Sequence, residues 1–222
     1  TSLNVPRVIG LEVSGSMPDE ATATDLALTV AEKLRAVGVV DCFVEVFGSG
    51  YSRLSVADRA TVANMSPEYG STCVFCPTDA NTIRFLKETG RTPEHAAMVE
   101  AYNRTQGLWV EKPDSAIDYD EVIHLDLGSI RRSVAGPSRP EQRIDLDKAT
   151  RTLSLTGETG AARRVAVAGQ DHDIGDGDVI IAAITSCTNT ANPRNMVLAG
   201  LIARNAVNRG LAVKPHVKTS LS

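Results

Sequence analysis

A single cysteine lies in an otherwise polar segment near the end of the chain. The run from Thr185 to Asn192 reads TSCTNTAN and places Cys187 between an apolar stretch and an expected helix. A helix N-terminus carries roughly half a positive charge, so it favours thiolate, which is both a nucleophile and a metal ligand. Neighbouring hydroxyls and amides, including that of Asn189, can donate hydrogen bonds to the sulfur. The run predicts a functional cysteine, although a helix cap beside a packed thiol gives the same pattern.

A second cluster combines an amide, a carboxylate and a glycine in the run from Asn64 to Gly70, which reads NMSPEYG. Asn64 and Glu68 are four positions apart, a spacing that places two side chains on one face of a continuous helix. Pro67 lies between them and weakens that geometry, because we expect it to end the helix. The alternative interpretation is a solvated helix terminus.

The pair Cys73 and Cys76 has the C-x₂-C spacing of half a zinc site or of a redox dithiol. The next histidine, His95, is 19 residues beyond Cys76 and stands alone. Val74 and Phe75 indicate a strand, which would point the two thiols to opposite faces of a sheet. We therefore expect structural cysteines, with a zinc or dithiol module as the weaker alternative.

Composition excludes several classes of protein. The 222 residues include 23 Lys or Arg and 27 Asp or Glu, and 42% of them are hydrophobic, which excludes a long disordered tail or a collagenous repeat. The net charge of −4 argues against a dedicated nucleic-acid module. The longest wholly apolar run, from Val179 to Ile184, is much shorter than the roughly 20 residues of a membrane helix, so no membrane contact is expected. Dispersed cysteines favour a reducing cytoplasm over a disulfide framework.

Helical and extended patterns alternate along the chain. Capping boxes at Thr22–Asp25 and Ser55–Asp58 predict two helix starts, and Gly38 predicts the end of the first helix. Strands alternating with helices predict an α/β fold with a largely parallel sheet. The predicted helices also include 80–88, one that begins at Pro93, and 193–208; the predicted strands or extended segments are 39–47, 72–75, 122–127, 151–155, 163–167, 178–184 and 213–218.

A change in the sequence pattern predicts a domain boundary. The stretch from Glu111 to Ser115 is typical of a linker, and the sixty residues after it contain no clear amphipathic helix. We expect one domain at residues 1–110 and the beginning of another at 111–222.

The two polar clusters resemble the aconitase family of iron–sulfur hydro-lyases. The residues that carry the resemblance are Ile181 to Thr190 with Asn192 and Pro193, and Ala57 to Gly70. The similarity is strongest to the bacterial aconitase A and iron regulatory protein branch, which includes the iron–sulfur-dependent 2-methylcitrate dehydratases. Further matches follow in order along almost the whole chain at Thr22–Leu28, Thr89–Arg91, Ala135–Pro137 and Val217–Leu221.

This resemblance implies an α/β/α-layered fold, with one whole domain and part of the next, and a [4Fe–4S] cluster held by three cysteines. Cys187 matches the first cluster ligand, and Asn189 lies in the same cofactor-binding segment. Asn64 matches a residue that hydrogen-bonds near the cluster sulfurs. Glu68 matches one that contacts the iron-bound water or hydroxyl. Cys73 and Cys76 match no ligand of the family.

The implied reaction interconverts citrate and isocitrate through cis-aconitate. Two alternatives are dehydration of 2-methylcitrate and RNA binding by the form without the cluster. The second and third cluster cysteines and the substrate arginines of the family match nothing in the chain. We therefore expect an internal fragment that is inactive alone and whose main partner is the remainder of the same polypeptide.

Overall fold

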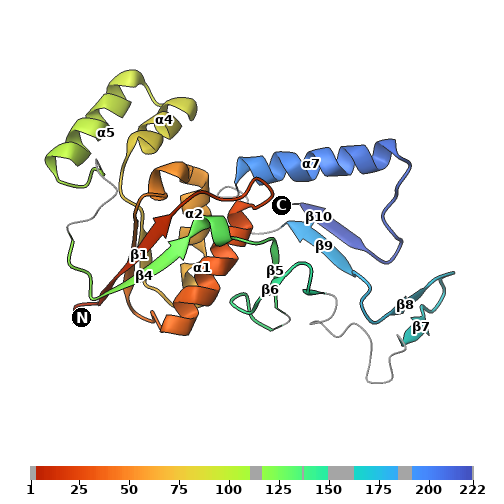
Figure 1. Ribbon diagram of the computed structural model, residues 1–222. Coiled ribbons are helices and arrows are strands. Elements are labelled where there is room, and N and C mark those ends of the chain that lie inside the picture. The colour runs from red at the N-terminus through yellow and green to blue at the C-terminus, as the bar shows by residue number, and fades with distance from the viewer. Residues whose placement is uncertain (1–3, 111–116, 137, 150–162, 185–191, 222) are drawn as a thin grey trace. The chain divides into compact units, whose positions relative to one another are not determined.

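The computed structural model describes residues 4–110, 117–136, 138–149, 163–184 and 192–221 (Figure 1). The chain divides into two compact units, Thr1–Arg143 and Ile144–Ser222, called unit 1 and unit 2 below. No helix in the described ranges is long and apolar enough to cross a membrane.

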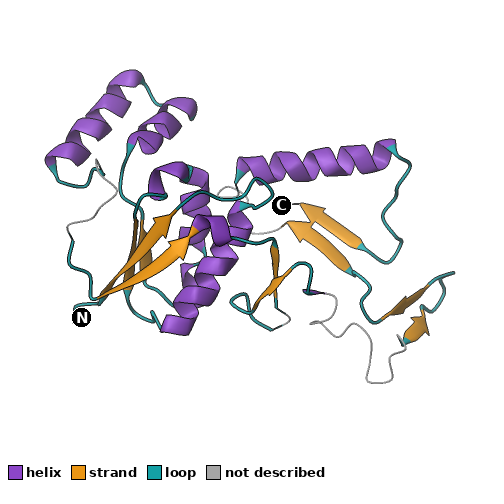
Figure 2. Cartoon of the chain, in the orientation of Figure 1, coloured by secondary structure: helices purple, strands orange, loops and turns teal. Residues whose placement is uncertain are grey.

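The core of unit 1 is built on a four-stranded sheet with the strand order β3-β2-β1-β4. Its three neighbouring pairs are all parallel, and Leu11 of the central strand β1 lies opposite both Val46 and Ile123. Figure 2 shows these strands with helices packed beside them, so the predicted α/β class with a mainly parallel sheet is confirmed. The strands are β1 (Val8–Ser14), β2 (Phe43–Phe47), β3 (Cys73–Phe75) and β4 (Glu121–Asp126).

Both predicted capping boxes are confirmed. Helix α1 (Ala23–Val37) begins after Thr22, whose hydroxyl accepts from the Asp25 N–H, while the Asp25 carboxylate accepts from the Thr22 N–H. Gly38, with φ of 87°, ends this helix in the left-handed region that glycine adopts without strain. Helix α2 (Val56–Asn64) begins after Ser55, which caps it with the same reciprocal pair of bonds.

Alternate residues of β1 turn toward α1 and form the centre of the core. Ile9, Leu11 and Val13 are each 1% exposed, and they belong to one buried cluster with Leu26 and Leu34 of α1. Burying such side chains stabilises the fold by about 1.5–3 kcal/mol each. The remaining elements of unit 1 are η1 (Tyr51–Arg53), α3 (Ser66–Tyr69), α4 (Ala80–Glu88), α5 (Pro93–Thr105), η2 (Leu127–Ser129) and β5 (Ser133–Ala135).

Unit 2 contains an antiparallel hairpin and a parallel strand–helix–strand arrangement. Strand β7 (Arg164–Ala166) pairs with β8 (Asp173–Gly175), and β9 (Ile181–Ile184) pairs in parallel with β10 (Lys218–Leu221). Helix α7 (Pro193–Asn208) connects the two parallel strands, as a crossover connection requires. One further strand, β6 (Arg143–Asp145), spans the boundary between the units in the sequence and pairs with β5.

Several boundaries differ from those predicted. Strand β1 is absent from the predicted elements, and β2 begins at Phe43 because Asp41, with φ of 59°, interrupts the extended backbone. The predicted strand at 213–218 is wrong, since β10 begins only at Lys218, after Pro215. Strand 151–155 lies outside the described residues. The expected boundary at 110/111 stays a prediction: β4, which follows it, pairs with β1.

Candidate active site

Asn64 and Glu68 lie on two consecutive short helices, α2 and α3. Met65 separates the helices, and its φ of −88° and ψ of 9° depart from α-helical values. Pro67 lies in the first turn of α3, where its missing N–H would have had no partner within the helix. Helix α2 thus ends before Pro67, as predicted, but this proline itself belongs to the start of a second helix.

Glu68 has an unusual environment for a carboxylate. It is half-buried, and its Oε2 atom is buried without a hydrogen-bond partner among the described residues. No other carboxylate oxygen in the described part of the chain has both properties. Buried polar atoms in folded proteins almost always have a partner, so an exception is a position for an ordered water, a bound group or a catalytic task.

Tyr69 fixes the helix that carries Glu68. Its side chain is fully buried, and its hydroxyl donates to the Val62 carbonyl at 3.1 Å, which joins α3 to α2. Burial raises the pKa of Tyr69 above its ordinary value, so the hydroxyl keeps the proton that it donates. Gly70 then ends α3 with φ of 87°.

Asn64 is the last residue of α2, and its side chain is exposed. No hydrogen bond joins it to Glu68 in the part of the chain that the structure describes. The two side chains therefore lie on neighbouring helices, separated by Met65, rather than on one continuous helix. Their assignment to a common site stays a prediction.

Helix α3 leads to the amino-terminal edge of the sheet. The Gly70 carbonyl accepts from the Asp41 N–H at 3.1 Å, and the Ser71 hydroxyl donates to the Cys42 carbonyl at 3.1 Å. These residues immediately precede β2 and β3. Ligands of open parallel sheets usually bind at the opposite, carboxyl edge. A search confined to the carboxyl ends of strands would therefore not select Glu68; residue type and spacing select it, and its role stays a prediction.

A buried ion pair supports α2 from within unit 1. The Arg59 guanidinium donates to both carboxylate oxygens of Asp79, at 2.9 and 2.6 Å, and to the Tyr51 hydroxyl at 3.0 Å. It also lies 3.9 Å from the centroid of the Tyr51 ring. The same Asp79 carboxylate caps α4 by accepting from the Asn81 N–H. Sequence reasoning missed this network, because only the capping role of Asp79 has a local signal.

The C-x₂-C cysteines are free thiols in different environments. Cys73 is exposed in β3, whereas Cys76 follows the end of that strand and packs against the core. Burial raises the pKa of Cys76 to about 11, so its thiol stays protonated at neutral pH. A protonated thiol is a poor nucleophile and metal ligand, which favours the structural interpretation.

Cys187 and Asn189 lie outside the described residues. On either side of them, β9 ends at Ile184 and α7 begins at Pro193, where the Asn192 side chain accepts from the Arg194 N–H at 3.0 Å. The predicted helix and its cap are therefore confirmed, and the predicted strand at 178–184 is confirmed only for Ile181–Ile184. Within the described ranges, no group of three or more His, Cys, Asp or Glu side chains is arranged to hold a metal ion.

Comparisons with known proteins give matches that extend over almost the whole chain. A family model described as "Aconitase family (aconitate hydratase)" matches residues 1–222. Aconitate hydratase A of Bradyrhizobium diazoefficiens is 49% identical over 227 residues, which cover 100% of this chain and 25% of that protein. The Rickettsia conorii protein of the same name is 48% identical over 98% of this chain and 25% of its own length. Phosphinomethylmalate isomerase of Streptomyces viridochromogenes is 48% identical over 100% of this chain and 26% of its own length.

Proposed function

The chain belongs to the aconitase family, and on this premise we propose that it is part of a hydro-lyase that interconverts citrate and isocitrate through cis-aconitate. It spans about a quarter of the length of the relatives that it matches, so this activity is proposed for a protein of the relatives' length. The observation that carries the proposal is the buried, unpartnered Oε2 of Glu68.

The proposed cofactor is a [4Fe–4S] cluster, which would supply a Lewis-acid iron to the substrate hydroxyl and carboxylate. This chain does not contain a complete donor set for it. Cys187 is the single proposed ligand, Cys42 belongs to the core of unit 1, Cys76 packs against that core, and the described residues hold no metal-binding group. We propose that the other ligands come from parts of a longer protein, and we derive no step through the cluster from this chain alone.

Glu68 is proposed to move a proton on and off the departing hydroxyl oxygen of the substrate. A general acid or base needs a carboxylate oxygen that its own protein does not occupy, and Oε2 of Glu68 meets this condition. The Tyr69 anchor holds the helix in place, so Glu68 need not reorganise its backbone during the transfer.

The proposed roles of the two asparagines are to donate hydrogen bonds. Asn64, exposed at the end of α2, would donate to groups near the cluster sulfurs, and Asn189 would do so from the segment of Cys187. Such bonds tune the ligands of a metal site. The proposed organisation is a second domain at 1–110 and the start of a third at 111–222, in a reducing cytoplasm.

The test is the substitution Glu68→Gln in a protein of the relatives' length that contains this chain. It keeps the size and hydrogen-bonding capacity of the side chain and removes its ability to exchange a proton. We expect kcat for the hydration of cis-aconitate to fall by about 10²–10⁴-fold, with a smaller change in KM. The matched control is Glu88→Gln, an exposed carboxylate at the end of α4. Equal kcat values for Glu68→Gln and the unchanged protein would refute the role of Glu68.

Substrate choice within the family needs its own measurement. A relative named phosphinomethylmalate isomerase and one named aconitate hydratase A have nearly equal identities to this chain, at 48% and 49%. Overall identity therefore does not distinguish the substrates. Turnover of citrate and of 2-methylcitrate by the same longer protein decides between the main proposal and its alternative. A salt-dependent mobility shift tests RNA binding by the form without the cluster.

A further inference from the structure

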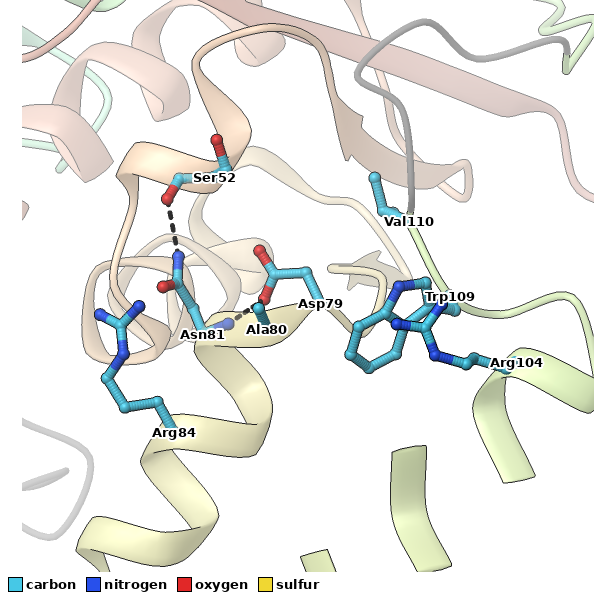
Figure 3. A pocket seen from close by; sticks show the side chains of 8 residues that line it. All are labelled: Ser52, Asp79, Ala80, Asn81, Arg84, Arg104, Trp109 and Val110. Atoms are coloured by element: carbon cyan, nitrogen blue, oxygen red, sulfur yellow. Dashed lines mark hydrogen bonds between the residues drawn. The ribbon is translucent and has the colours of Figure 1, made fainter. Parts of the chain in front are cut away.

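An open cleft of about 640 Å³ lies in unit 1 beside the start of α4 (Figure 3). Neither Asn64 nor Glu68 is among its lining residues, so the proposed function does not use it. Its volume lies within the roughly 300–1,000 Å³ of small-molecule sites. The lining residues are Ser52, Asp79, Ala80, Asn81, Arg84, Arg104, Trp109 and Val110.

One side of the cleft carries an arginine without a counterion. Arg84 of α4 is exposed and forms no ion pair or hydrogen bond within the described part of the chain. The lining carboxylate, Asp79, is occupied by Arg59 at 2.6 Å and by the N–H groups of α4. Asp79 therefore does not neutralise Arg84, and the Arg84 side of the cleft is electropositive.

The other side is a flat, stacked pair. The Arg104 guanidinium lies over the Trp109 ring, 4.1 Å from its centroid. It also donates a hydrogen bond to the Glu100 carboxylate at 2.9 Å. Figure 3 shows this pair and Arg84 on opposite sides of Asp79 and Asn81. A planar guanidinium stacked on an indole offers a surface on which an aromatic ring can stack.

We propose that this cleft binds a small nucleoside phosphate, with its base against the Arg104–Trp109 pair and its phosphate on the Arg84 guanidinium. One side of the cleft is flat and aromatic, and the other is cationic. A nucleoside phosphate has an aromatic base that matches the first side and an anionic phosphate that matches the second. Guanidinium is the side chain that recognises phosphate oxygens best, because its N–H groups pair with two of them.

The test uses the fluorescence of Trp109, which is the sole tryptophan in the 222 residues and therefore reports on this cleft. The 222-residue chain is titrated with adenosine monophosphate, adenosine and inorganic phosphate at constant ionic strength. We expect adenosine monophosphate to change the emission saturably and to bind more tightly than either half. A shift of the Trp109 indole N–H resonance on binding provides a second readout.

The decisive variant is Arg84→Gln, which removes the charge from an exposed position. We expect it to weaken adenosine monophosphate binding about tenfold, to the level of adenosine, because it removes one charge-assisted contact. The matched control is Arg91→Gln, an exposed arginine beyond the other end of α4. The proposal is overturned by an absent response to adenosine monophosphate, by adenosine or phosphate alone binding equally well, or by equal affinity in the Arg84→Gln variant.

Discussion

Burial affects Glu68 and Cys76 in different ways. Glu68 keeps one carboxylate oxygen without a partner, at a position where the family resemblance predicts proton transfer. Cys76 instead has a thiol whose pKa is raised to about 11 by burial, which makes it inert at neutral pH. Residue type and spacing drew attention to both positions, but only the folded environment shows that the Cys76 thiol is packed and that Glu68 keeps an oxygen without a partner.

The raised pKa of Cys76 predicts a pH dependence of stability. In the unfolded chain this thiol loses its proton near pH 9, whereas in the folded chain it keeps the proton up to about pH 11. The unfolded state therefore binds fewer protons between these values, and the free energy of unfolding falls as pH rises, by at most about 1.4 kcal/mol per unit. Below pH 9 the contribution is constant.

Urea unfolding at pH 7, 9 and 10 measures this slope, and Cys76→Ala is expected to reduce it. Cys73→Ala is the matched control, because it removes an exposed thiol from the same segment. A slope between pH 9 and 10 that is the same in the Cys76→Ala variant would contradict the assignment. Tyr51 and Tyr69, whose pKa values burial also raises, add to the slope at higher pH in every variant.

At the scale of elements, the Arg59–Asp79 pair joins α2 to the start of α4. Asp79→Asn keeps a good capping residue for α4 but leaves the buried Arg59 charge uncompensated. We expect this substitution to lower the free energy of unfolding by about 3–5 kcal/mol, as measured in urea. The double variant Arg59→Met with Asp79→Asn should recover part of the loss. A loss below about 1 kcal/mol for Asp79→Asn would show that the pair is not buried as described.

Local signals predicted the helices better than the strands. Caps at Thr22 and Ser55, and the glycine after α1, depend on residues within a few positions of each other, so the sequence shows them directly. Strand pairing is not local: β4 was predicted as an extended segment, but β1 was missed, and nothing in the local pattern places β4 beside a strand more than a hundred positions earlier. The Arg59–Asp79 pair was missed because its residues lie 20 positions apart, beyond the few positions that a capping pattern spans.

At the scale of the whole molecule, unit 2 exposes many apolar side chains. Helix α7 has no buried residue, and Ile181 of β9 is 66% exposed. A parallel two-stranded sheet whose strands are connected by one helix is a small arrangement for independent stability. Exposed apolar surface of this extent normally contacts other protein segments. The described α7 residues that are exposed include Val197, Leu198, Leu201, Ile202 and Val207.

The single proposed cluster ligand leads to a prediction for the 222-residue chain. After reconstitution with iron and sulfide and removal of excess reagents, we expect no cluster absorbance in the visible region, because a [4Fe–4S] cluster needs several thiolate ligands. A protein of the relatives' length should retain the absorbance and lose it in the Cys187→Ser variant, with Cys73→Ser as control. A stable cluster with citrate turnover on the 222-residue chain would contradict this expectation.

The strand order β3-β2-β1-β4 also determines when the sheet can be completed. The pairs that join β1, β2 and β3 connect residues about thirty positions apart, whereas Ile9 pairs with Glu121, 112 positions later. Closing a longer loop costs more chain entropy, and contacts distant in sequence slow folding. During synthesis, β1 to β3 with α1 and α2 can therefore assemble first, with the β4 edge of β1 left open until the ribosome releases β4.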